Sequence, residues 1–452
     1  MWYLLIMRRL IRSNLQDWYS SPHRKPLVLK GARQVGKTFA VNEFGRTVVE
    51  GQNGGRYHYF DLKKERDLHS IFQETQDIKK ILEFIELKKQ TKITAGRDLI
   101  FLDEIQDCSQ AISSLKYFEQ DLAELHVIAA GSHLGLVKNE ESFPVGKVNF
   151  LSMFPMTFYE FLVALKEPLC PYLDGFDPKS PQPLPAFIHQ QLLQYLFYYF
   201  AVGGLPEAVL RFKEHHTSSL PDALKLARQI QNELLTGYEA DFSKYSGTVN
   251  ANHIHSVFRS ISKQLAKSFD EPTSKFKFSG VIPNQKGFDR IIGPLTWLTS
   301  SRLCIKSYIA SRSGHPLQAY TTDNVFKVFY LDVGLLNAAL DTPMESIVED
   351  HLESYKGYIV ENFVCQELYS KLDRDLVSWQ EGQAEVEFLI NQGAEIIPIE
   401  VKSGTKSRRA KSLDAYIAKY HPKVAYKLSA QNVGVQEGRF ITLPLYLCSH
   451  IF

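Results

Sequence analysis

The motif at residues 31–38 constrains this chain more than any other feature of its sequence. It reads Gly-Ala-Arg-Gln-Val-Gly-Lys-Thr and fits the pattern G-x-x-x-x-G-K-[ST]. An apolar run, Leu27-Val28-Leu29, precedes it, and a helical pattern beginning at Phe39 follows it. A strand before and a helix after are the context that a phosphate-binding loop requires, so we expect a P-loop here.

Such a loop would bind the phosphates of ATP. Glycines let the backbone come close enough for its N–H groups to face the β-phosphate, and the N-terminus of the next helix adds partial positive charge. Lys37 would reach the β- and γ-phosphates, and Thr38 would be a ligand of Mg²⁺. The predicted nucleotide-binding residues are Gly31, Ala32, Arg33, Gln34, Val35, Gly36, Lys37, Thr38 and Phe39.

A second apolar run, at residues 99–102, leads directly into Asp103 and Glu104. Both carboxylates would then lie at the sheet edge where open α/β folds bind their ligands. Asp103 would hold the Mg²⁺ shell, and Glu104 would polarise the attacking water. The alternative is that two acids merely end a strand.

A third apolar run, His126 to Ala130, ends in Gly131 and Ser132. The Ser132 hydroxyl would lie where an ATPase positions a polar group near the γ-phosphate, although a turn serine needs no such role. The sequence identifies no arginine finger. Lys147 is a candidate for that role, and a surface lysine is the simpler interpretation.

The spacing of apolar runs predicts an α/β chain of several domains. Up to about residue 165, short apolar runs alternate with amphipathic stretches, as in a parallel sheet crossed over by helices. The residues after 185 are helical in pattern, with a break at 203–206, and helical patterns near 254–300 precede a strand at 326–331. The predicted domains are a P-loop NTPase domain at 7–165, a helical lid at 186–245, a winged-helix-like domain at 250–340 and an α/β domain at 345–452.

The last domain contains a possible second site. Alternation along strand 396–401 places Glu400 and Lys402 on one face, and a short turn could bring Glu387 from the preceding strand beside them. Glu361 lies on the helix before. Carboxylates beside a lysine can bind divalent ions for phosphodiester hydrolysis, and the alternative is an amphipathic hairpin with a solvated face.

Basic residues follow this possible site, opposed by a single acid, Asp414. Such a run could hold a polyanionic backbone, whereas most runs of this kind are solvated surface. The run consists of Lys402, Lys406, Arg408, Arg409, Lys411, Lys419, Lys423 and Lys427.

Overall composition excludes several classes of protein. The net charge of +2 implies neither attraction to nor repulsion from nucleic acid. Five scattered cysteines show no zinc or disulfide spacing, which fits a reducing cytoplasm. No segment approaches the ~20 apolar residues of a membrane span, so we expect a cytoplasmic protein without membrane contact.

Several motifs together resemble one family, the prokaryotic AAA-type ATPases that carry a C-terminal domain of unknown function related to the PD-(D/E)XK nuclease fold. The similarity covers the chain from about residue 7 to its end. The motifs are those at 31–38, Phe-Leu-Asp-Glu-Ile-Gln-Asp at 101–107, Ala-Ala-Gly-Ser at 129–132, Ser-Phe-Pro-Val-Gly-Lys-Val at 142–148, Phe-Pro-Met-Thr-Phe-Tyr-Glu-Phe-Leu at 154–162, Gly-Gly-Leu-Pro-Glu-Ala at 203–208 and Leu-Asp-Val-Gly-Leu-Leu at 331–336.

The resemblance implies an AAA-like ATPase core, a helical and winged-helix-like middle and a restriction-endonuclease-like end. It assigns the magnesium–ATP roles to Lys37, Thr38, Asp103 and Glu104. It assigns the nuclease-type catalytic and metal roles to Glu361, Glu387, Glu400 and Lys402. The family usually has aspartate where this chain has Glu387, and the extra methylene would move any bound metal.

The sequence therefore supports one main hypothesis and two alternatives. The main hypothesis is an ATP- and Mg²⁺-dependent ATPase whose nucleotide state controls a module that acts on DNA or RNA. The first alternative is an ATP-dependent switch with a catalytically silent nuclease-like domain, and the second is a transport or signalling P-loop protein unrelated to nucleic acid. A homo-oligomer is possible, because AAA-type sites often use an arginine from a neighbouring copy.

Overall fold

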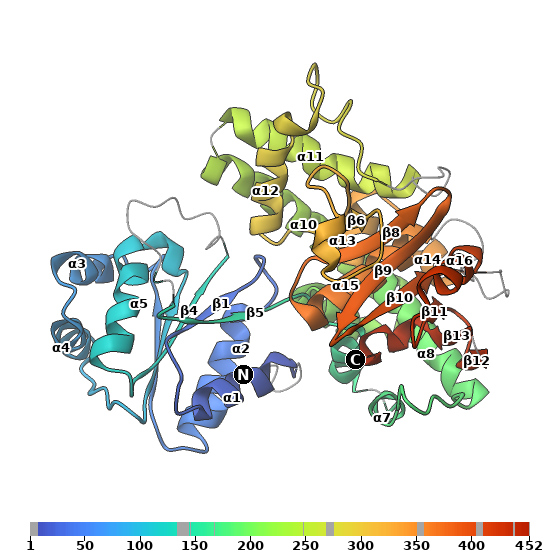
Figure 1. Ribbon diagram of the computed structural model, residues 1–452. Helices are drawn as coiled ribbons and strands as arrows, with labels where there is room; N and C mark the ends of the chain where they lie inside the picture. Colours follow the sequence, from blue (N-terminus) through green and yellow to red (C-terminus); the bar gives the residue numbers. More distant parts are fainter. Residues whose placement is uncertain are drawn as a thin grey trace. The chain divides into compact units, whose positions relative to one another are not determined.

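The computed structural model of the chain divides into two compact units, Met1–Phe154 and Pro155–Phe452, which we describe separately (Figure 1). The structure describes residues 8–132, 144, 146–166, 168–246, 248–267, 275–349, 357–403, 410–436 and 439–451. Within these residues, no helix is both long and apolar enough to cross a membrane.

The first unit contains a five-stranded sheet in the order β2-β3-β4-β1-β5, with every neighbouring pair parallel. Its elements are α1 (Ile11–Ser20), β1 (Leu27–Lys30), α2 (Lys37–Phe44), a π-helical turn (Gly45–Glu50), β2 (Tyr57–Asp61), α3 (Asp67–Glu74), α4 (Ile78–Lys89), β3 (Leu99–Asp103), a 3₁₀ turn (Ile105–Asp107), α5 (Ser109–Asp121), β4 (His126–Gly131) and β5 (Asn149–Ser152).

Burial of the central strands explains why this sheet forms. Every residue of β3 and β4 is buried, as expected of strands covered on both faces. The apolar sides of α3, α4 and α5 pack against one face and form a single core cluster with the strands. These helices lie together on one side of the sheet in Figure 1, and α1 and α2 lie on the other.

The three predicted apolar strands are confirmed as β1, β3 and β4. The sequence did not reveal β2 and β5, whose exposed and polar positions interrupt the apolar pattern. The first unit ends at Phe154, before the predicted boundary at 165. The reason is tertiary, because Met156 and Phe158 donate backbone hydrogen bonds to residues of the second unit's own core.

The second unit begins with helices. The break at 203–206 separates α8 from α9 as predicted. The helices are α6 (Phe158–Leu165), α7 (Cys170–Asp174), α8 (Ala186–Val202), α9 (Pro206–His215), α10 (Leu220–Ser246), α11 (Thr248–Lys267), α12 (Ile292–Ser300), α13 (Val333–Ala339), α14 (Met344–Glu349), α15 (Gly357–Leu372) and α16 (Lys411–Tyr420), with 3₁₀ turns at Phe288–Arg290, Leu317–Tyr320 and Leu445–His450.

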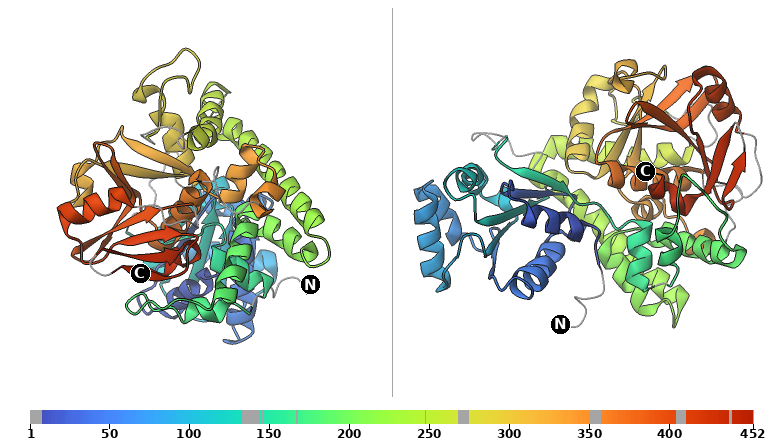
Figure 2. Two further views of the ribbon diagram at one scale, coloured as in Figure 1. Left: turned by 90° about the vertical axis from the view of Figure 1, so that its right-hand side faces the viewer. Right: turned by 60° about the horizontal axis from the view of Figure 1, so that its bottom comes forward.

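An eight-stranded mixed sheet completes the second unit, in the order β12-β13-β11-β10-β9-β8-β6-β7. Figure 2 shows this sheet in orange to red beside the green to yellow-green helices α8 to α11. Its strands are β6 (Cys304–Ala310), β7 (Phe326–Tyr330), β8 (Leu376–Glu381), β9 (Ala384–Gln392), β10 (Glu395–Val401), β11 (Tyr426–Ser429), β12 (Gly434–Gln436) and β13 (Phe440–Pro444).

This sheet crosses the predicted domain boundary between 340 and 345. The hairpin predicted as the wing of a winged-helix-like domain is the antiparallel pair β6–β7, and β6 also pairs with β8 in parallel. The hairpin therefore belongs to the C-terminal sheet. The β6–β8 pairing joins distant segments, so no local pattern in the sequence could reveal it.

A buried polar network fixes α15 within the second unit. Asp332, ahead of α13, accepts hydrogen bonds from the backbone N–H groups of Gly204 at 2.6 Å and Leu335 at 3.0 Å. Glu367 on α15 accepts the N–H of Phe158 at 3.0 Å, and Gln366 donates to the hydroxyl of Tyr199 at 2.7 Å. Burial raises the pKa of Asp332 to about 6 and that of Glu367 to about 8.

We expect Glu367→Gln to remove a pH-dependent loss of stability. The raised pKa means that folded Glu367 keeps its proton between about pH 4.5 and 8, where the unfolded chain loses it. The stability of the unaltered protein should therefore fall by up to ~1.4 kcal/mol per pH unit over this window. Glutamine retains the acceptor for the Phe158 N–H and does not titrate. The urea midpoint of the Glu367→Gln variant should therefore exceed that of the unaltered protein, and the difference should be larger at pH 8 than at pH 5. An equal difference at both pH values would contradict the assignment.

Candidate nucleotide-binding site

The P-loop backbone is already curved for binding an anion. It joins the end of β1 to α2, and Gln34 and Gly36 have left-handed φ values of 66° and 93°. Gly36 carries no strain there because it lacks a Cβ. Gly31 lies so close to the backbone oxygen of Met153 that a side chain at this position would collide with it. Both glycines of the motif are thus required by geometry.

The Lys37 ammonium lies beneath the loop, and the residue is 8% exposed. It donates hydrogen bonds to the carbonyl oxygens of Gly31 at 3.0 Å and Ala32 at 2.8 Å and to the Ser132 hydroxyl at 3.1 Å. Burial lowers its pKa to about 8, against the opposing influence of Glu104 and Asp103. A phosphate would supply the counter-charge that this buried ammonium needs.

Thr38 and Asp103 lie beside each other in the structure. The Thr38 hydroxyl donates to Asp103 Oδ2 at 2.7 Å, and the Tyr59 hydroxyl donates to the same oxygen at 3.3 Å. Burial raises the pKa of Asp103. A hydroxyl and a carboxylate at this separation fit Mg²⁺, which takes only one or two protein oxygens when phosphates and waters complete its octahedron. The sequence had not singled out Tyr59.

Glu104 follows Asp103 with a left-handed φ of 52°. Non-glycine residues seldom adopt this conformation, and it concentrates at functional sites. The Glu104 carboxylate accepts a hydrogen bond from the amide of Gln106. Glu104 is thus a half-buried carboxylate close enough to Lys37 to act on its charge.

Arg9 is a further residue of this site that sequence reasoning missed. Its guanidinium donates to the carbonyl oxygens of Val35 and Phe154, each at 2.7 Å. It thereby connects the P-loop to the segment that follows β5. Lys147, the candidate for a finger residue, forms an ion pair with Glu119 at 3.0 Å instead.

Glu387, Glu400 and Lys402 lie together in the second unit. Lys402 Nζ lies 2.5 Å from Glu400 Oε1 and 3.6 Å from Glu387 Oε1, and Glu387 Oε2 accepts the N–H of Val401 at 3.0 Å. Burial and the neighbouring Glu387 raise the pKa of Glu400. The predicted convergence of Glu387, Glu400 and Lys402 is thus present in the structure.

Glu361 lies beside a lysine in the structure. It accepts from Lys327 Nζ at 2.7 Å, and Lys327 also pairs with Glu385. Neither Lys327 nor Glu385 was identified from the sequence. In the described part of the chain, no group of three or more His, Cys, Asp and Glu side chains is arranged to hold a metal ion. The metal roles of Glu361, Glu387 and Glu400 therefore stay predictions.

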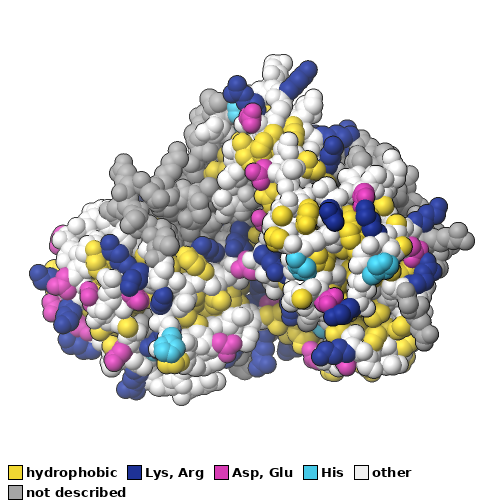
Figure 3. Space-filling view, in the orientation of Figure 1, with side chains coloured by type: hydrophobic (Ala, Val, Ile, Leu, Met, Phe, Trp, Pro, Cys, Tyr) yellow, Lys and Arg dark blue, Asp and Glu magenta, His cyan; other side chains and the backbone are white. Residues whose placement is uncertain are grey.

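The basic run after Lys402 is not a row of unpaired cations. Lys419 pairs with Glu381, Lys423 lies 2.5 Å from Glu395, and Lys427 is buried on β11. Lys406, Arg408 and Arg409 lie outside the described residues. Basic and acidic side chains are mixed on the face drawn in Figure 3.

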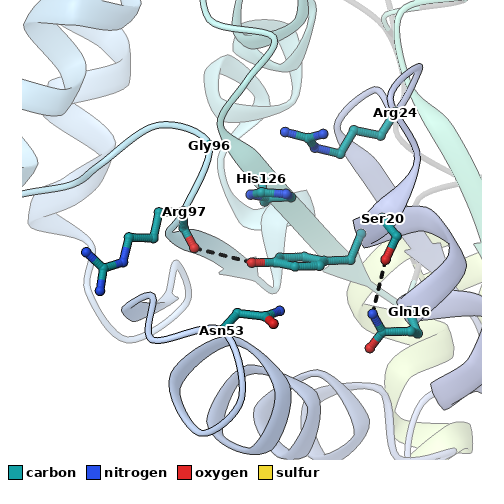
Figure 4. Close-up of a pocket in the computed structure, with 8 residues that line it drawn as sticks. Gln16, Ser20, Arg24, Asn53, Gly96, Arg97 and His126 are labelled. Atoms are coloured by element: carbon teal, nitrogen blue, oxygen red, sulfur yellow. Dashed lines mark hydrogen bonds between the residues drawn. The ribbon is translucent and has the colours of Figure 1, made fainter.

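A polar cavity of about 430 Å³ lies at the other edge of the first sheet, where the strands begin (Figure 4). The Tyr19 ring stacks on the His126 ring, with 4.1 Å between the ring centroids. The Tyr19 hydroxyl donates a hydrogen bond to the Arg97 carbonyl oxygen at 3.3 Å. The P-loop that follows β1 and Asp103 at the end of β3 lie at the opposite edge, so this cavity is distinct from the nucleotide site. It is lined by Gln16, Tyr19, Ser20, Arg24, Asn53, Gly96, Arg97 and His126.

Comparisons with known families agree with this geometry. Residues 23–162 match a family described as an AAA domain. Most of the first unit thus matches an AAA domain. Residues 193–346 and 356–446 match two domains of unknown function, DUF8612 and DUF4143. No curated protein matches the chain in sequence.

Several solved structures resemble the chain at low sequence identity. A Walker-type ATPase of Pyrococcus abyssi is 14% identical, with a TM-score of 0.47 over 74% of this chain and 96% of that one. The ORC2 protein of Aeropyrum pernix, in ADPNP–ADP complexes, is 13% identical, with a TM-score of 0.42 over 79% and 94%. AMPPCP-bound DnaA of Aquifex aeolicus is 13% identical, with a TM-score of 0.30 over 65% and 87%.

We expect ATP affinity to weaken above about pH 8. Free Lys37 loses its proton near this pH, whereas bound phosphates would keep it charged, so binding at higher pH must take up a proton. The dissociation constant should be flat between pH 6.5 and 7.5 and then rise by up to ~tenfold per pH unit. Lys37→Arg is the matched control, because arginine stays charged at every pH in this range. The dissociation constant for ATP is measured by calorimetric titration. Equal values for the unaltered protein at pH 7 and 9.5 would contradict the role assigned to Lys37.

Proposed function

We propose that this chain is a Mg²⁺-dependent ATPase whose nucleotide state controls a catalytically silent, nuclease-like C-terminal module. The observation that carries the ATPase part is the convergence of Lys37, Thr38, Asp103 and Ser132 around one P-loop in an AAA domain. The site offers a buried ammonium for the phosphates and an acceptor pair for the metal.

Each residue has a distinct task in this proposal. Lys37 would leave its carbonyl partners to bind the β- and γ-phosphates, and Ser132 would follow it to the γ-phosphate. Thr38 and Asp103 would hold Mg²⁺, which neutralises charge that develops on the phosphates. Glu104 would orient the attacking water and accept its proton. An arginine from a neighbouring copy in a homo-oligomer would complete the site.

The covalent link between the units supports control by nucleotide. In the first unit, Met153 donates its N–H to the Lys30 carbonyl oxygen at 2.7 Å, and Arg9 ties Phe154 to the P-loop. In the second unit, Met156 donates its N–H to Gly204 at 2.6 Å. Only Pro155 separates these anchored segments, and proline has a fixed φ. A displacement of the P-loop would be transmitted to the second unit through this short connection.

Two further observations favour the silent module and a cytoplasmic location. Glu361, a predicted metal ligand, is paired with a lysine. Lys419 and Lys423 pair with acids and Lys427 is buried, so these three residues offer little free charge to DNA or RNA, whereas Lys411 is exposed. All five cysteines are free thiols, as expected of a reducing compartment.

We expect Lys37→Ala and Glu104→Gln to separate binding from turnover. Lys37→Ala removes the main cation for the phosphates and should weaken ATP binding by at least tenfold. Glu104→Gln keeps the shape of the side chain but not the base, so ATP should still bind while turnover falls by ~10²-fold or more. Binding is measured by calorimetry and turnover by phosphate release.

Lys147→Ala is the matched control for the loss of a lysine, since Lys147 pairs with Glu119 away from the P-loop. Its binding and turnover should equal those of the unaltered protein. Unchanged affinity and turnover in Lys37→Ala would overturn the assignment of this site.

A further inference from the structure

The carboxylate cluster of the second unit contains a buried lysine. Lys327, on β7, is 3% exposed. Its ammonium lies 2.7 Å from Glu361 Oε1 on α15 and also pairs with Glu385 on β9. These two ion pairs place a positive charge inside the cluster.

Few oxygens of this cluster are available to a metal. Glu387 uses one oxygen for the Val401 N–H and the other for Lys402. Glu400 Oε1 is held by Lys402, which leaves Glu400 Oε2 as a buried oxygen without a partner. Glu361 and Glu385 share Lys327. A divalent ion needs several convergent oxygens, and Glu361, Glu385 and Glu400 each have one oxygen already paired with an ammonium.

The charge of Lys327 also disfavours the binding of a divalent ion. A divalent ion entering this cluster would approach the Lys327 ammonium in a region that salt screens weakly. Glu387 contributes as well, because its Oε2 already accepts the Val401 N–H. The nuclease-like set of carboxylates in this chain does not fit a divalent metal.

We propose that Lys327 is the resident cation of this cluster and takes the place of a metal. The ammonium joins β7, α15 and β9 through ion pairs, and the module binds no divalent ion and cleaves no phosphodiester. This inference is independent of the ATPase site, since every residue that carries it belongs to the second unit.

Manganese binding to the full chain without nucleotide tests the inference. Free Mn²⁺ is followed by its electron paramagnetic resonance signal, which disappears on binding. The unaltered protein and Glu400→Gln should bind the same amount of Mn²⁺, because Glu400 holds no metal. Binding that is present in the unaltered protein and lost in Glu400→Gln would overturn the proposal. This comparison keeps Lys327 and its ion pairs in place.

Lys327→Met tests the role of the lysine directly. Methionine keeps most of the side-chain volume and removes the charge, so this variant should gain one Mn²⁺ site that the unaltered protein lacks. The gain should disappear in Lys327→Met/Glu400→Gln. Lys306→Met is the matched control, because Lys306 lies on the adjacent strand β6 outside the cluster, and it should gain no site. A folded Lys327→Met that gained no site would overturn the proposal.

Cleavage assays complete the test and separate it from the ATPase proposal. Single- and double-stranded DNA and RNA are incubated with the unaltered protein, with Mg²⁺ or Mn²⁺ and with or without ATP. No cleavage is expected, and cleavage that Glu400→Gln abolishes would overturn the inference. Phosphate release from ATP is measured on the same samples. Failure of the ATPase proposal would appear there and leave the metal result unaffected.

Discussion

The parallel register of β1, β4 and β3 is the constraint on which the nucleotide site depends. β4 pairs with β1 on one side and with β3 on the other, so all three strands deliver their last residues to one edge of the sheet. That edge receives the P-loop from β1, Ser132 from β4 and Asp103 from β3. Hydrogen bonds of 2.7–3.1 Å from Thr38 and Lys37 then connect the three strands.

The second unit is organised by buried polar groups as much as by apolar packing. Asp332 and Glu367 would destabilise an apolar core if they were unpaired, and each is matched to backbone N–H groups from distant segments. The motifs at 154–162, 203–208 and 331–336 meet in this network. Their contribution is to position α15, and through it Glu361, at the C-terminal sheet.

The C-terminal cluster shows how one set of residues can serve two purposes. Two or three carboxylates beside a lysine form a metal site when their oxygens converge and stay available. They form an internal ion-pair network when a second ammonium enters, as Lys327 does here. Lys327, which decides between these two outcomes, lies on β7. This strand belongs to the hairpin that was predicted as part of a separate domain. The chemistry of this site therefore follows from the topology of the sheet.

The sequence by itself determined the features that depend on neighbouring residues. The P-loop, its flanking strand and helix, the acidic end of β3 and the fully apolar strands β1, β3 and β4 were predicted because each is a local pattern. The pairing of Glu387, Glu400 and Lys402 was also predictable, since a short hairpin joins their strands. Tertiary structure alone decided the roles of Arg9, Tyr59, Lys327 and Glu385, the joining of β6 and β7 to the C-terminal sheet, and the end of the first unit at Phe154. Contacts between residues far apart in the chain create these features, and no periodicity or motif records which distant side chain will lie beside a given charge.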